Sequence, residues 1–140
     1  MTMNRRTLNA ALAAAALGGL LPASVLAQKK LVLGFAQVGA ESEWRTANTE
    51  SIKASAKEAG IELKFSDAQQ KQENQIKAIR SYIAQKVDVI AFSPVVESGW
   101  DTVLREAKAA KIPVVLTDRS VNSKDDTLYV TFMGSVSYTH

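Results

Sequence analysis

Cysteine is absent from this 140-residue chain, and histidine occurs only once, as His140. No disulfide framework can therefore hold the fold, and zinc sites built from histidine or cysteine are excluded. The same lack removes the imidazole that most catalytic triads use as their general base. We therefore expect neither a metal nor a cofactor, and we do not expect an enzyme.

The chain also lacks an apolar run long enough to cross a membrane. The run from Ala10 to Leu21 has twelve residues, against the roughly 20 that a spanning helix needs. Arg5 and Arg6 precede it, and small residues ending at Ala27 follow it. This is the pattern of an export signal cleaved after residue 27, and the arginine pair favours the twin-arginine route. We expect a periplasmic protein without stable membrane insertion after cleavage, because the run has no polar face typical of a cytosolic amphipathic helix.

A strongly basic balance is missing once the signal is set apart. The whole chain has 17 Lys and Arg against 14 Asp and Glu, and Arg5 and Arg6 leave with residues 1–27. Residues 28–140, which are 113 of the 140, then carry 15 basic and 14 acidic side chains. No basic stripe with interleaved aromatics occurs, so we expect no nucleic acid partner. A segment of this length forms one domain.

Apolar runs and helical patterns alternate along the rest of the chain. Ser42 is suited to cap the first helix, and Gly60 to end it. Strands are predicted at residues 31–36, 61–65, 87–92, 114–117 and 128–132, and helices at residues 43–59, 70–85 and 100–110. Helical spacing places these residues on the inner faces: Ile52, Ala56 and Ala59; Ile76, Ile79 and Ile83; Val103, Leu104 and Ala107.

This alternation predicts an α/β fold with a parallel three-layer sheet. Right-handed crossovers give the strand order 2-1-3-4-5 with helices on both faces. Ligands of such sheets bind beyond the carboxyl ends of the strands. The polar or aromatic residues that follow strands are Gln37, Glu41, Trp44, Arg45, Asp67, Ser93, Asp118 and Arg119.

This set of side chains suits a monosaccharide. Carboxylates accept hydrogen bonds from sugar hydroxyls, a guanidinium donates from a planar fork, and an indole covers the apolar face of a sugar ring. Each residue also has a structural interpretation. On this interpretation, Asp118 and Arg119 would form an ion pair at the rim, and Trp44 would pack on the sheet. Glu41 and Glu43 would complement a helix N-terminus, and Asp67 would cap the next helix. Trp100 is interpreted as a core residue or as a cover for a loop.

Four blocks, in this order, resemble periplasmic sugar-binding proteins of ABC importers, in the ribose/galactose-binding group and most of all the galactofuranose-binding type. They are residues 34–45 (GFAQVGAESEWR), 67–75 (DAQQKQENQ), 93–96 (SPVV) and 117–119 (TDR). The resemblance implies two α/β lobes that close on one sugar and dock on a membrane permease. It implies sugar contacts at Glu41, Trp44, Arg45, Asp118 and Arg119, smaller polar contacts at Gln37 and Ser93, and a structural role for Asp67.

The resemblance ends near Ser135, because residues 136–140 do not follow the family pattern. We therefore expect residues 28–140 to be a fragment that holds most of the first lobe and is truncated after about residue 135. Two other classes stay open. The sensor domain of a transcriptional repressor has this fold but needs a helix-turn-helix where the export signal lies. A secreted carbohydrate-acting enzyme would use Glu41 and Asp118 as its carboxylates.

Overall fold

The computed structural model describes residues 28–134. In chain order the elements are β1 (Val32–Gln37), α1 (Glu43–Glu58), β2 (Glu62–Asp67), α2 (Gln72–Ala84), β3 (Val89–Phe92), α3 (Asp101–Ala109), β4 (Val114–Asp118), the 3₁₀ turn η1 (Asp126–Leu128) and β5 (Thr131–Gly134). The predicted export signal and the predicted break after residue 135 lie outside the described residues.

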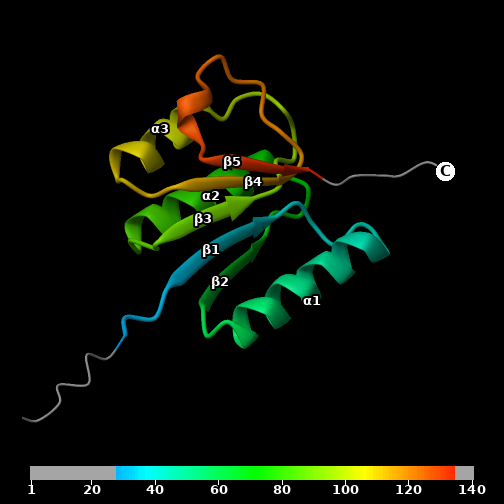
Figure 1. Cartoon of the computed structure of the whole chain (residues 1–140). Coiled ribbons are helices and arrows are strands. Elements are labelled where there is room, and N and C mark those ends of the chain that lie inside the picture. Colours follow the sequence, from blue (N-terminus) through cyan, green and yellow to red (C-terminus); the bar gives the residue numbers. More distant parts are fainter. Residues whose placement is uncertain (1–27, 135–140) are drawn as a thin grey trace, which may run out of the picture.

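The strands form one parallel sheet in the order β2-β1-β3-β4-β5, which confirms the predicted topology. Figure 1 shows α1 on one face of the sheet and α2 and α3 on the other. Phe35 of β1 lies between Phe65 of β2 and Ala91 of β3 in the register. This arrangement brings the carboxyl ends of β1, β3 and β4 to the same edge. No helix within residues 28–134 is long and apolar enough to cross a bilayer.

Local turns explain why α2 and β5 begin later than the sequence predicts. α2 begins at Gln72 rather than at residue 70, since Gln69 and Gln70 both adopt positive φ, at 51° and 60°. The Asp67 carboxylate accepts from the Gln69 N–H at 2.7 Å, so it shapes this turn and does not cap α2. β5 begins at Thr131 rather than at residue 128, because the preceding residues form η1.

The apolar core lies on the α2/α3 face of the sheet. It includes Ile79, Phe92, Trp100, Leu104 and Leu116, all of which are almost inaccessible to water. The Trp100 ring lies 4.8 Å from the Phe92 ring, centroid to centroid, which confirms Trp100 as a core residue. The predicted inner face of α3, formed by Val103, Leu104 and Ala107, is also confirmed.

The buried stripe of α2 runs through Gln75, Ile79 and Tyr82, while Ile76 and Ile83 are only partly buried beside it. Gly34 of β1 lies under the Tyr82 ring, and a Cβ at this position would be 2.5 Å from Tyr82 Cγ. Only a glycine therefore lets α2 approach β1 this closely.

The α1 face is packed differently. Ala56 is buried, but Ala59 is exposed, so its predicted inward orientation is wrong. Ala59 is the C-cap that follows the last helical residue, Glu58. Phe35 stacks on Phe65 with ring centroids 6.2 Å apart beneath α1.

Candidate functional site

Arg45 is the centre of the polar cluster at the carboxyl edge of the sheet. It lies on the first turn of α1, where its backbone N–H donates to the Ser42 hydroxyl at 3.2 Å, as the predicted N-cap requires. The residue is only 4% exposed. A short loop, residues 38–42, connects β1 to this turn, and the guanidinium lies buried at the sheet edge rather than in solvent.

Three strand ends converge on this guanidinium. Its Nε donates to Glu41 Oε1 at 3.0 Å, and its Nη2 donates to Asp118 Oδ2 at 2.8 Å. Its Nη1 donates to Ser93 Oγ at 3.3 Å. The two carboxylate side chains are 26% and 22% exposed, so both keep access to water and to a ligand. Four of the predicted site residues, Glu41, Arg45, Ser93 and Asp118, therefore form one connected group.

Trp44 lies beside this group and stays half-exposed. Its ring centroid is 4.8 Å from Arg45 Cζ, and 47% of the residue is accessible. The ring therefore does not simply pack on the sheet. A hollow of about 330 Å³ opens next to it, lined by Trp44, Asn48, Ile52, Thr117, Asp118, Met133 and Gly134. An aromatic face and a carboxylate thus border the same space.

Asp118 is held in an unusual backbone conformation. Its φ is +64°, in the left-handed region that non-glycine residues seldom adopt and that often marks functional positions. Arg45 is its close partner, whereas Arg119 Nε lies 3.9 Å from the same oxygen. Arg119 is half-exposed and donates to the Val95 carbonyl at 3.3 Å. The Asp118–Arg119 rim pair therefore exists, but it is secondary to the buried pair with Arg45.

Gln37 is the one predicted site residue that the structure keeps apart from the cluster. It is 1% exposed, and its Nε2 donates to Asn48 Oδ1 at 2.9 Å and to Thr49 Oγ1 at 3.1 Å. Its Oε1 accepts from the Val38 N–H. The side chain therefore ties the end of β1 to α1.

Gln75 on α2 was not singled out from the sequence. It is fully buried and hydrogen-bonds to backbone groups of Ala36, Ser93 and Val95. The available signal was its position four residues before Ile79, which places it on the buried stripe of the helix.

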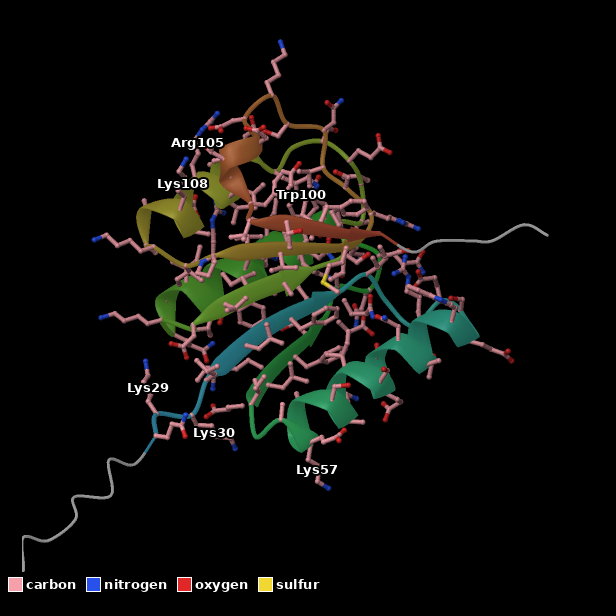
Figure 2. All side chains as sticks on the ribbon, in the orientation of Figure 1. Lys29, Lys30, Lys57, Trp100, Arg105 and Lys108 are labelled. Carbon is pink, nitrogen blue, oxygen red and sulfur yellow. The ribbon has the colours of Figure 1, made fainter. Side chains whose placement is uncertain are left out.

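Several lysines gather at the opposite end of the sheet from Arg45. Figure 2 shows Lys29, Lys30 and Lys57 near the end where β1 begins and α1 finishes. Among them, Lys29 pairs with Asp88 at 3.3 Å. The Val32 N–H, and then Lys29, hold the pKa of Asp88 below its usual range. Within residues 28–134, no group of three or more His, Cys, Asp or Glu side chains is placed to hold a metal ion.

Comparison with known proteins agrees with this architecture. Residues 33–133 match the model of the periplasmic binding protein domain. The galactofuranose-binding protein YtfQ of Escherichia coli (strain K12) is 58% identical over 101 residues, which cover 72% of this chain and 32% of that protein.

Two solved structures are similar over the same region. A Mycobacterium smegmatis protein in complex with β-D-fucofuranose is 68% identical with a TM-score of 0.74, over 75% of this chain and 34% of that one. The binding component of the arabinose ABC transporter from Shewanella sp. ANA-3, bound to α- and β-L-arabinofuranose, is 62% identical with a TM-score of 0.74, over 74% and 34%. This chain spans about a third of the length of each relative. By sequence and by fold, it belongs to the periplasmic binding protein family.

Proposed function

We propose that this chain forms one lobe of the substrate-binding protein of an ABC-type carbohydrate importer. We further propose that the Arg45 cluster, formed by Glu41, Arg45, Ser93 and Asp118, contributes half of a site for a furanose sugar such as galactofuranose. The observation that carries the proposal is the convergence of Glu41, Ser93 and Asp118 on one buried guanidinium, beside the half-exposed Trp44. Relatives named or solved with furanose ligands support the same choice of sugar.

The cluster has acceptors and donors to offer to a sugar. Within residues 28–134, Arg45 engages Oε1 of Glu41 and Oδ2 of Asp118, so the second oxygen of each carboxylate is left to accept from ring hydroxyls. A guanidinium has five N–H donors, and three of its nitrogens each use one here. The Trp44 ring supplies an apolar face for C–H groups. Arg119 adds an exposed guanidinium at the rim.

The proposal extends to export and transport. Residues 1–27 are proposed as a signal peptide that delivers the protein to the periplasm. We propose that a second lobe supplies the rest of the sugar cage and part of a surface that docks on a permease, since this chain matches only about a third of the length of its relatives. We propose a binding role without turnover, consistent with relatives that are named as binding proteins.

Titration of the chain with locked ring forms tests this function. Methyl β-D-galactofuranoside should shift amide resonances of residues 41–45, 93–95 and 117–119, with a Kd in the millimolar range, roughly −4 kcal/mol, since one lobe supplies only part of the contacts. The Trp44→Leu variant should weaken this binding, while Arg105→Met on the far helix α3 should not change it.

Three results would count against the proposal. If neither the furanoside nor the matching pyranoside shifts any resonance, the chain does not bind these sugars and the proposal fails. Equal affinity for the two removes the furanose preference. Release of methanol from the glycoside would assign catalysis to Glu41 and Asp118 instead.

A further inference from the structure

The buried amide of Gln75 joins the ends of two neighbouring strands. Its Nε2 donates to the Ser93 carbonyl at 2.6 Å and to the Ala36 carbonyl at 3.3 Å. Its Oε1 accepts from the Val95 N–H at 2.9 Å. The side chain is 0% exposed, so three backbone groups depend on one amide that water does not reach.

These contacts lie where β1 and β3 separate. The last paired residues of the two strands are Ala36 and Phe92. Beyond them, the chain leaving β1 leads to α1 on one face, and the chain leaving β3 leads to α3 on the other. Such a divergence opens the crevice that doubly wound sheets use for ligands. Gln75 enters this gap from the α2 side and replaces the strand-to-strand hydrogen bonds that end there.

Ser93 connects Gln75 to the guanidinium. Its carbonyl accepts from Gln75, while its hydroxyl accepts from Arg45 Nη1 at 3.3 Å. Ser93 is 1% exposed and follows the last residue of β3. Gln75 of α2 therefore fixes the position of Ser93, and Ser93 in turn limits where the guanidinium lies between Glu41 and Asp118.

We propose that Gln75 is a positioning residue of the sugar site, which acts through Ser93 on Arg45 and does not touch the ligand. This inference rests on the proposed function. It implies that the affinity for the furanoside depends on the amide of a helix that faces away from the hollow.

The Gln75→Glu variant tests this in the full chain. The ionised carboxylate keeps the acceptor for Val95 but loses both donors and faces the carbonyls of Ala36 and Ser93. Burial, together with these carbonyls, favours the neutral carboxyl and raises its pKa. When protonated, the carboxyl again donates a hydrogen bond and so restores one of the two that the amide donates. We expect affinity for methyl β-D-galactofuranoside to fall about tenfold at pH 8.5 and to recover largely at pH 5.5.

The matched control is Gln72→Glu. Gln72 lies on the same helix, and its Nε2 donates to the Ser98 carbonyl of the same loop at 2.7 Å, but at the surface. Its variant should bind like the parent at both pH values. A residue that served only the stability of the fold would lower the melting temperature in Gln75→Glu without a pH-dependent loss of affinity relative to the parent.

Melting curves and a second variant keep the test decisive. If Gln75→Glu is unfolded at pH 8.5, Gln75→Met, which keeps the side-chain length without hydrogen bonds, is titrated instead and should show the same tenfold loss at both pH values. A folded variant with parental affinity overturns the inference about Gln75 alone. A parent chain that binds no sugar overturns the proposed function on which it rests.

Discussion

Replacing Arg45 with methionine should destabilise the protein more than any other exchange of a charged residue within residues 28–134. The methionine keeps much of the apolar stem but removes all three hydrogen bonds of the guanidinium. Glu41 and Asp118 then face each other's charge without the cation between them. Removing one partner of a buried pair is costly mainly because the remaining charge stays desolvated.

The size of the effect follows from the contacts. Two charge-assisted hydrogen bonds, at 3.0 Å and 2.8 Å, contribute about 1.5 kcal/mol each, the low end of their range. The low end applies because the two carboxylates are about a quarter exposed and therefore partly screened. The Ser93 contact is long and adds little. We therefore expect Arg45→Met to lower the free energy of unfolding by about 3 kcal/mol.

Urea denaturation followed by circular dichroism at pH 7 measures this loss. Arg105→Met is the control, since Arg105 also pairs with an acid four residues before it, at 3.5 Å, but 60% of its side chain is exposed. It should cost less than about 0.5 kcal/mol. Adding Asp118→Asn to Arg45→Met should recover part of the loss because it removes one orphaned charge. A loss equal to that of the control would refute the reasoning, as would strictly additive effects in the double variant.

Two further predictions concern the scaffold. Gly34→Ala should cost about 3 kcal/mol by overpacking, because the new Cβ meets Tyr82, whose hydroxyl is fixed by a hydrogen bond to the Phe35 carbonyl at 2.9 Å; a melting temperature like that of the parent would contradict the packing. Asp88→Ala should be less stable than the parent at pH 7, but this difference in the free energy of unfolding should shrink in acid. The pKa of Asp88 is lowered in the folded protein, so its stabilisation is present above about pH 3.9 and disappears as the pH falls through the folded pKa. An unchanged gap between pH 7 and pH 2 would exclude this linkage.

The fold could be predicted because its signals are local and agree with one another. Continuous apolar runs mark strands covered on both faces, and Ser42 and Gly60 mark the limits of α1. Boundaries were less accurate where side chains reshape the backbone. The turn stabilised by Asp67 moves the start of α2 to Gln72, and Asp125 accepts from the Thr127 N–H to form η1. Residue propensities alone do not reveal these side-chain contacts.

The site could be predicted in its location but not in its internal contacts. Strand ends bring Glu41, Ser93 and Asp118 to one edge in any sheet of this order. That Arg45 turns inward to all three depends on how deeply α1 seats on the sheet, which is a tertiary property. Gln37 lies two residues after Phe35 in β1, so both side chains point to the α1 face of the sheet. The alternation of side chains along the strand would have predicted this orientation.

The uneven packing of the two faces predicts different free energies of local opening for the three helices. The continuous apolar cluster includes residues of α2 and α3 but none of α1, whose buried residues are Arg45, Thr49 and Ala56. Local opening follows the apolar contacts that must be broken, so α1 should release its amide protons to exchange sooner than the two helices opposite. The first turn of that helix carries Trp44 and Arg45. Of the three helices, the one that contributes Trp44 and Arg45 to the site is thus the one that separates from the sheet at the lowest free energy.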